Sequence, residues 1–252
     1  GLEAESATGA YVDTTTENQN LVEPRTGNQL KIEEKIATIE TDLYIAKISS
    51  LCGGSILSYK IKDHLTIDSN YVNLITKNNV NNLLLSFKNL DGDDVFIKDG
   101  WIQHGLVDSI FLFDETHVLN YTNTHQGKNI TKTLTFYPND YLIEIDIDLT
   151  SVSNNIFANT FSLGWAGGLP PTEKDTVSEA TFFGAYLYQG DELLDVKVSS
   201  KETFSNDYRG QTAWVATRSK YFVVSLIDMR KDQIIGSNIS ATFEKRELYD
   251  IT

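Results

Sequence analysis

The sequence predicts an all-β protein built as a large sandwich of antiparallel strands. Short apolar segments alternate with polar residues at a period of two, which is typical of strands with one buried face. Turn residues separate these segments at short intervals, and residues 172–180 alone have a weak helical pattern. We expect roughly fourteen to sixteen short strands. No internal repeat is visible, which disfavours propellers and solenoids.

Composition narrows the classes of partner. The chain has 252 residues, which suits one large β domain. Its net charge is −14, from 21 basic and 35 acidic residues, so nucleic acid and anionic membrane surfaces are disfavoured partners. No apolar run is long enough to span a membrane. Cys52 is the only cysteine, which excludes an intrachain disulfide and predicts a buried, inert thiol.

The pattern divides the chain near residue 36. Residues 1–36 are rich in Thr, Glu, Asn and Gly and show no apolar period, which predicts a flexible tether. Residues 37–252 form the predicted β domain. The chain does not begin with Met, so we expect a piece of a longer protein.

Several hairpins can be placed from turn chemistry. After the strand-like segment 37–50, CGGS interrupts the pattern and ILSYKI resumes it. Two strands flank Asp91-Gly92, and two more flank residues 125–127. The clearest pair is 130–136 with 141–149, joined by Pro138-Asn139-Asp140. In its second strand the isoleucines face one way and the carboxylates the other.

That acidic row invites a metal interpretation. Its members are Glu144, Asp146 and Asp148, which project from one face of the strand. No histidine or further carboxylate converges on them by sequence spacing. Threonines 131, 133 and 135 are their expected cross-strand neighbours, so we favour a solvated sheet face and expect no metal.

Catalytic motifs are absent from the sequence. The histidines His64, His104, His117 and His125 show no zinc-binding spacing, and neither a nucleophile elbow nor a phosphate loop occurs. We therefore expect no enzyme activity and no cofactor.

Aromatic residues are the remaining candidates for a binding site. Trp165, Trp214 and Tyr221 either line a sugar- or peptide-binding cleft or fill the core between the sheets. The same alternatives apply to Trp101, and for each tryptophan we favour the core. The segment 221–227 is apolar at both parities, which predicts a central strand buried on both faces. We accordingly expect Trp214 in the core and a polar break at Arg218.

Four segments together resemble one family. Residues 34–64 contain Glu40-Thr41-Asp42-Leu43, then Gly53-Gly54, and resemble the opening of the large periplasmic domain of the membrane protein insertase YidC. The hairpin 130–150, with Tyr141 after its turn, and the segment 210–227 are similar to later motifs of that family. Residues 161–175 resemble the form found in Bacteroidetes- and Chlorobi-type members.

The resemblance carries expectations about fold and function. It implies a β-supersandwich related to galactose-mutarotase-like sandwiches, without cofactor or metal. It implies a periplasmic domain of a bacterial inner-membrane protein that assists insertion, folding and assembly of membrane proteins. The tether would then follow an N-terminal transmembrane helix, and the chain would end before the membrane core. Expected partners are the Sec translocon, its accessory subunits and nascent membrane proteins, with the domain itself a monomer.

Two other functions remain open at this stage. A mutarotase-like enzyme would need a histidine acid and a carboxylate base, for which Glu144 or Asp148 are the candidates. Sequence spacing brings no histidine to either. A purely structural spacer cannot be distinguished from a docking module by sequence.

Overall fold

A computed structural model describes residues 32–76, 82–105, 108–196, 204–231, 233–241 and 249–251. All of them lie in one unit of the chain, residues 32–252. Of the predicted tether, 1–36, only residues 32–36 are described, and the first strand begins at Ile36. The role of residues 1–31 therefore stays a prediction.

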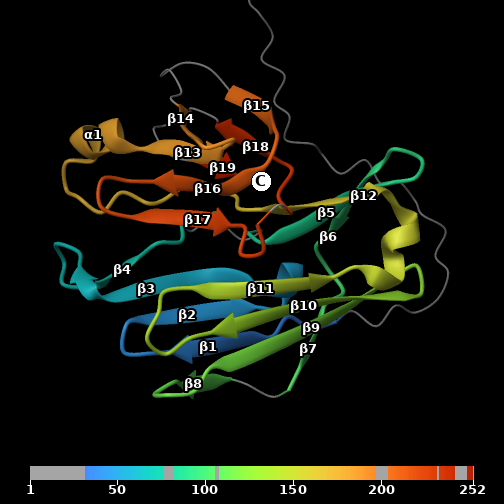
Figure 1. Ribbon diagram of the computed structural model, residues 1–252. Helices are drawn as coiled ribbons and strands as arrows, with labels where there is room; N and C mark the ends of the chain where they lie inside the picture. The colour runs from blue at the N-terminus through green and yellow to red at the C-terminus, as the bar shows by residue number, and fades with distance from the viewer. Residues whose placement is uncertain are drawn as a thin grey trace, which may run out of the picture. The chain divides into compact units, whose positions relative to one another are not determined.

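The described residues form 19 strands in five sheets, which confirms the all-β class and exceeds the expected number of strands (Figure 1). The first sheet, in the order β4-β3-β2-β1-β8, contains Tyr71–Asn73, Ser55–Leu65, Tyr44–Ser49, Ile36–Glu40 and Ser109–Phe111. The second sheet, β11-β10-β9-β7, contains Ile143–Asp148, Lys128–Phe136, His117–His125 and Ile102–His104. The third sheet, β12-β5-β6, contains Ile156–Gly164, Leu84–Asn89 and Asp94–Ile97.

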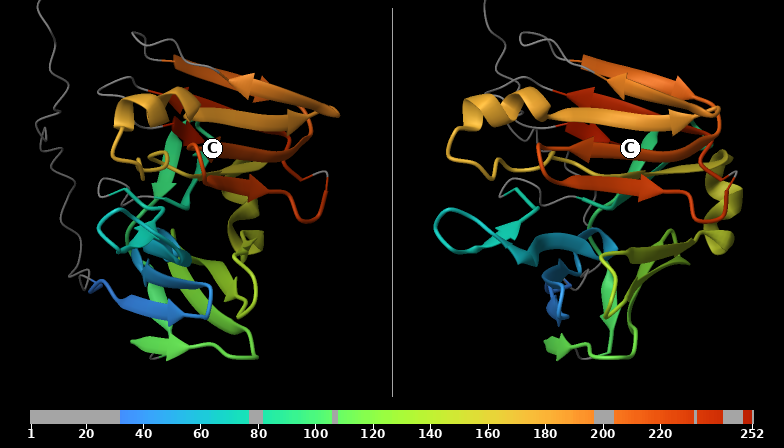
Figure 2. Two further views of the ribbon diagram at one scale, coloured as in Figure 1. Left: turned by 90° about the vertical axis from the view of Figure 1, so that its left-hand side faces the viewer. Right: turned by 60° about the vertical axis from the view of Figure 1, so that its left-hand side comes forward.

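Two further sheets come from the C-terminal third of the chain (Figure 2). The fourth sheet, β14-β13-β16-β17, contains Glu192–Val196, Gly184–Gln189, Thr212–Arg218 and Val223–Ile227. The fifth sheet, β15-β18-β19, contains Phe204–Arg209, Gly236–Ala241 and Tyr249–Ile251.

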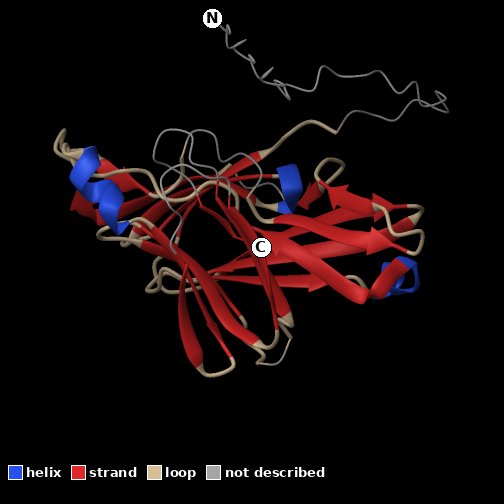
Figure 3. Ribbon diagram, turned by 90° about the horizontal axis from the view of Figure 1, so that it is seen from above, coloured by secondary structure: helices blue, strands red, loops and turns tan. Residues whose placement is uncertain are grey.

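Helix is confined to short segments among the strands (Figure 3). The helix α1, Thr176–Glu179, and the 3-10 turn η3, Ala180–Phe182, overlap the segment predicted to be weakly helical. Two more 3-10 turns, η1 at Leu51–Gly53 and η2 at Thr150–Asn155, have no counterpart in the sequence prediction.

The predicted hairpins are confirmed. The strands β5 and β6 flank Asp91-Gly92, and β9 and β10 flank residues 125–127. The β10–β11 register places Thr131, Thr133 and Thr135 opposite Asp148, Asp146 and Glu144, as the alternation predicts. Among the described strands one pairing is parallel, between β1 and β8.

The first and second sheets share a core. The inward residues of the first sheet include Ala37, Ile39, Tyr44, Ala46 and Ile48, and those of the second include Leu119, Tyr121, Ile130, Leu134 and Phe136. The rings of Tyr44 and Tyr59 stack at 4.7 Å, and the Tyr59 hydroxyl donates to the carbonyl of Tyr141 at 3.0 Å. Because this hydroxyl crosses from β3 to the β10–β11 turn, the contact sets the spacing of the two sheets.

The Gly-Gly pair after Cys52 lets the chain enter this core. Gly53 has φ +65°, and a Cβ there would lie 2.8 Å from the Trp101 ring. Gly54 has φ +110°, and its Cβ would lie 2.8 Å from the side chain of Leu134. Both positions require glycine, because the backbone is left-handed and the space is filled. Trp101 is buried, as expected, and its indole donates to the Ile97 carbonyl at 3.0 Å.

Lys132 is fully buried beneath this turn. Its ammonium donates to the carbonyls of Cys52 at 3.0 Å and Leu83 at 2.5 Å. The two acceptor residues both have left-handed backbone, with φ +53° and +59°. Desolvation lowers the pKa of Lys132 to about 7. Cys52 is buried as predicted, and burial raises the pKa of its thiol.

The expectation for residues 210–227 is wrong in two respects. The strand β17 lies at the margin of the fourth sheet, and none of its residues is buried. Trp214 is half-exposed, because its parity on β16 is outward while Val215 and Thr217 point into the core. Apolar residues at both parities here mark a strand with one solvent-facing side. The polar break at Arg218 is confirmed, since β16 ends there.

We expect Gly53→Ala to lower the free energy of unfolding by about 2–4 kcal/mol, since it adds both left-handed strain and overlap with Trp101. Urea unfolding followed by tryptophan fluorescence measures the loss. Gly127→Ala is the matched control, because Gly127 has φ +75° with nothing within 4 Å of its Cβ position. That control isolates strain, at about 1 kcal/mol. Equal losses in the two variants would contradict the role of the Trp101 contact.

Lys132 predicts a pH-dependent stability. Between its folded pKa of about 7 and the unfolded value, the unfolded chain binds a proton that the folded chain does not. The free energy of unfolding should therefore rise with pH, by at most about 1.4 kcal/mol per unit. In Lys132→Met this contribution disappears, and two carbonyls lose their donor, at a cost of about 1–3 kcal/mol.

Urea unfolding of wild type and Lys132→Met between pH 7.5 and 9.5 tests this. The unfolding free energy of wild type minus that of Lys132→Met should increase as pH rises, because tyrosine and histidine titrations are common to both. The variant Lys60→Met removes an exposed lysine of β3 and should give a profile parallel to wild type. A constant difference between wild type and Lys132→Met would show that Lys132 is charged when folded.

Candidate binding groove

An open groove of about 600 Å³ lies between two segments distant in sequence. One wall is the tip of the β3–β4 hairpin, with Thr66, Ile67, Asp68 and Asn70. The other wall is the segment after Trp165, with Pro171, Thr172, Glu173 and Lys174. Its lining combines prolyl and isoleucyl surface with carboxylate, amide and ammonium groups.

Local hydrogen bonds shape the hairpin wall. The N–H of Thr66 donates to the Asn70 carbonyl at 2.7 Å, and that of Ser69 donates to the Thr66 carbonyl at 2.9 Å. Ser69 adopts φ +59°, which closes the tight turn. Leu65, Ile67 and Tyr71 are exposed around this tip, so the wall presents apolar surface to solvent.

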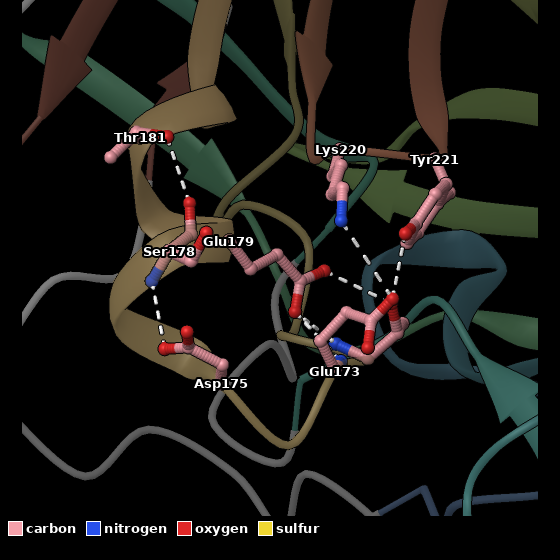
Figure 4. Close-up of polar contacts among 8 residues, drawn as sticks. Glu173, Asp175, Ser178, Glu179, Thr181, Lys220 and Tyr221 are labelled. Carbon is pink, nitrogen blue, oxygen red and sulfur yellow. Dashed lines mark hydrogen bonds and ion pairs between the residues drawn. The ribbon is translucent and has the colours of Figure 1, made fainter.

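A buried carboxylate holds the opposite wall. Glu179 at the end of α1 is 1% exposed and accepts from the N–H groups of Thr172 and Glu173, both at 2.8 Å (Figure 4). It also accepts from the Thr172 hydroxyl at 2.9 Å. Asp175 orients α1 by accepting from the N–H of Ser178 at 3.0 Å. The segment 172–175 is therefore folded around one carboxylate rather than around apolar contacts.

Glu173 ties this wall to the turn between β16 and β17. Its carboxylate accepts from the Tyr221 hydroxyl at 2.7 Å, and the Lys220 ammonium lies 3.9 Å away (Figure 4). Lys220 also lies over the rings of Tyr221 and Phe182, at 4.7 and 5.8 Å from their centroids. The Tyr221 hydroxyl and then the nearby Glu173 charge raise the pKa of Lys220.

Three charged residues beside the groove have partners within the chain. Glu179 and Glu173 already accept hydrogen bonds, and Lys220 faces a carboxylate. Within the described parts of the chain, no three His, Cys, Asp or Glu side chains cluster as metal ligands would. The lining exposes the apolar side chain of Ile67 together with the charged groups of Asp68 and Lys174.

Comparison with known proteins identifies the family. The family model described as the YidC periplasmic domain matches residues 36–251. The chain belongs to the YidC periplasmic domain family. This match confirms the family resemblance that the four sequence motifs indicate. Separately, no helix of the described residues has the length and apolar character needed to cross a membrane.

Curated relatives support the YidC assignment. The membrane protein insertase YidC of Chlorobaculum parvum is 30% identical over 205 residues, covering 79% of this chain and 35% of the relative. The insertases of Prosthecochloris aestuarii and Chloroherpeton thalassium are each 31% identical, over 77% and 80% of this chain and 34% and 35% of their own. The chain thus spans about a third of the length of these relatives. No solved structure matches significantly, so the link to galactose-mutarotase-like sandwiches stays a prediction.

The structure gives physical reasons for the YidC-like motifs. In Glu40-Thr41-Asp42-Leu43, the buried Thr41 hydroxyl accepts from the N–H groups of Leu43 and Tyr44 at 3.0 and 3.1 Å, which forms the β1–β2 turn. The Gly53-Gly54 pair fits beside Trp101 and Leu134. Tyr141 supplies the carbonyl that receives the Tyr59 hydroxyl.

The three candidate aromatics of this YidC-family chain have three different environments. Trp165 is buried, at 4% exposure, and belongs to the core. Trp214 lies half-exposed on the outer face of the fourth sheet, where its ring stacks with Tyr188 at 6.1 Å. Tyr221 is exposed and contacts Glu173 beside the groove. The structure therefore does not unite them in one cleft.

The acidic row does not converge either. The Arg230 guanidinium donates to Asp146 at 2.6 Å, and the Tyr137 hydroxyl donates to Glu144 at 2.6 Å. Asp148 accepts from the N–H of Thr150 at 2.8 Å, and hydrogen bonding to the Thr150 side chain and then to this N–H lowers the pKa of the Asp148 carboxyl. Each carboxylate thus has its own partner.

The histidines of a mutarotase-like site are dispersed among other contacts. His104 contacts the Thr122 hydroxyl at 2.7 Å, and His64 and His125 meet the rings of Phe222 and Phe87. Desolvation lowers the pKa of His117. Among the hydrogen bonds of the described residues, none links a histidine to Glu144 or Asp148.

Sequence reasoning missed the residues that build the groove. Glu179 and Glu173 lie in a segment predicted only to be weakly helical. The partners of Glu179 come from the tight loop just before it, whereas those of Glu173, Lys220 and Tyr221, lie more than 40 residues away in the sequence. One signal was available: six of the eight residues 172–179 have carboxylate or hydroxyl side chains and precede an apolar strand, a pattern typical of self-capping loops.

We expect Glu179→Ala to loosen the groove wall, because two partly buried N–H groups and one hydroxyl lose their acceptor. Amide exchange at Thr172 and Glu173, measured by NMR, should accelerate at least tenfold, which corresponds to about 1.4 kcal/mol. Tyr221→Phe is the control, since it removes only the exposed hydroxyl contact, and should change exchange less than threefold. Unchanged exchange in Glu179→Ala would mean that other contacts hold the segment.

Proposed function

We propose that this chain is a non-catalytic module of a membrane protein insertase that docks polypeptide partners on the periplasmic side of the bacterial inner membrane. The partners would be accessory subunits of the Sec translocon or emerging segments of nascent membrane proteins. The whole protein would assist insertion, folding and assembly of inner-membrane proteins. The domain itself would act as a monomer, without cofactor.

The observation that carries this proposal is the family match over residues 36–251, together with relatives whose printed name is membrane protein insertase. The geometry supports a binding role. The groove is open, its walls are preorganised by Glu179 and Ser69, and the lining carboxylate of Glu173 already accepts the Tyr221 hydroxyl. Preorganised walls reduce the ordering cost of binding a flexible segment.

Site-specific photo-crosslinking in intact membranes tests the proposal. A benzoylphenylalanine at position 67, in the full-length insertase, should crosslink to a Sec accessory subunit or a nascent membrane protein. Position 96 is the matched control, because Ile67 and Phe96 are 64% and 62% exposed and Phe96 lies outside the groove lining. Calorimetry of the purified chain with Sec accessory domains and unfolded segments supplies an independent readout.

Two results would contradict this function. One is equal crosslinking at positions 67 and 96, which would indicate collision rather than docking. The other is the absence of both binding heat and crosslinks, which would leave a spacer role.

A further inference from the structure

The margin of the fourth sheet at β17 presents unused backbone hydrogen-bonding groups. The N–H of Ser219 donates to the Phe222 carbonyl, and that of Asp228 donates to the Ala213 carbonyl, both in register with the β16–β17 ladder. Hydrogen-bonded pairs alternate along an antiparallel ladder, so the backbone N–H and C=O groups of Val224 and Leu226 also point toward β16. The N–H and C=O groups of Val223, Ser225 and Ile227 therefore point away from the sheet. Among the described residues, no hydrogen bond uses them.

This margin lacks the features that protect the other sheet margins. Natural proteins prevent edge pairing with short strands, charged residues or bulges. Four margins are short, with three residues each: β4, β7, β8 and β19. Four others carry charged residues: Asp94 on β6, the Glu144 row on β11, Glu192 and Asp195 on β14, and Asp207 and Arg209 on β15. The margin β12 has a bulge between Ile156 and Phe161. By contrast β17 reads VVSLI, with neither charge, proline nor bulge.

An apolar row continues across the sheet from this margin. The register places Leu193, Tyr188, Trp214 and Ile227 side by side on β14, β13, β16 and β17. Leu193 and Ile227 are 59% and 49% exposed, and Val223 is 61% exposed. These side chains lie on the outer face, whereas Phe222, Val224 and Leu226 pack against the core. A partner strand at β17 would extend this row with its own outward side chains.

Most charged residues near β17 have partners within the chain, and Arg218, which is paired with Val223, donates to the Phe182 carbonyl and lies over the Tyr186 ring. Lys220 faces Glu173, and Arg230 donates to Asp146. Asp228 accepts from the N–H groups of Gln233 and Ile234 at 2.7 and 3.0 Å. What remains is an uncharged margin, whose complement is an uncharged segment. A second copy of the chain is a poorer complement, because each copy has a net charge of −14.

We propose that β17 binds an extended, uncharged polypeptide segment as a fifth strand of the fourth sheet. The main chain of the segment pairs with Val223, Ser225 and Ile227, and its β-branched or apolar side chains alternate onto the row of Trp214 and Ile227. The choice of a polypeptide as occupant rests on the proposed docking function, and the site is distinct from the groove at Ile67.

The test uses the whole chain and a labelled heptapeptide of alternating Thr and Val. We expect saturable binding by fluorescence anisotropy, and at least tenfold slower amide exchange at Val223, Ser225 and Ile227 when the peptide is present. A peptide with N-methyl groups on alternate amides offers fewer donors and should bind at least tenfold more weakly.

Protein variants make the test specific. Ser225→Pro removes an outward N–H and no bond to β16, and Val223→Lys introduces an edge charge while leaving the backbone intact. Each should weaken peptide binding at least tenfold. Phe96→Lys is the matched control, because it adds the same charge at similar exposure, 62%, on a margin of the third sheet, and should change binding less than twofold. Circular dichroism melting confirms folding of each variant.

Three outcomes would overturn strand addition at β17. One is peptide binding that Ser225→Pro and Val223→Lys leave unchanged. Another is slow exchange of the three amides without peptide, which would show that the chain itself covers the margin. The third is a concentration-dependent dimer that Val223→Lys abolishes, which would identify a second copy as the occupant.

The result is separable from the docking function itself. If Val223→Lys abolishes peptide binding but leaves membrane crosslinks at position 67 intact, strand addition is confirmed in vitro and docking proceeds through the groove. If the peptide fails to bind while those crosslinks form, strand addition is wrong and the docking function stands.

Discussion

The fold depends on one buried amine. Lys132 on β10 donates to the carbonyls of Cys52, between β2 and β3, and of Leu83, before β5. One side chain therefore connects the second sheet to the first and third. Both acceptor residues have left-handed backbone, which costs a non-glycine residue about 1–2 kcal/mol. The strained turns and the lysine require one another, because the turns aim two carbonyls inward and only a long donor reaches both.

The surrounding residues follow from that arrangement. Trp101 lies across Gly53 and Leu134 lies across Gly54, so the turn that carries the Cys52 carbonyl is closed on both sides. The buried amine has no carboxylate partner among its hydrogen bonds, and desolvation therefore favours its neutral form. The fourth sheet joins the same core through Leu187, Val215 and Leu226, and surface contacts such as Arg230 with Asp146 add to this packing. Its opposite face remains exposed to solvent at Val223 and Ile227.

The sequence predicted what is local and missed what depends on neighbours distant along the chain. Hairpins were predictable because turn residues and alternation lie within about ten residues. The position of Lys132 was readable in principle, since it shares the inward parity of Ile130 and Leu134, but a lysine normally indicates solvent. Trp214 was misplaced because β17 is apolar at both parities, and parity alone cannot distinguish a central strand from a margin. The Glu173 contact with Tyr221 joins residues 48 positions apart, which no spacing rule reveals.

The distribution of charge separates two kinds of surface on one domain. Four sheet margins, β6, β11, β14 and β15, carry acidic residues that oppose edge pairing. A strand-binding margin must lack such residues, and a margin without them is an aggregation hazard unless a partner or the surroundings limit access. The contacts of Phe222 with His64 and of Arg230 with Asp146 lie at the two ends of β17, next to other sheets. Access limited in this way would admit a single extended chain more readily than the edge of another folded sheet, and this favours a polypeptide segment over a second domain as the occupant.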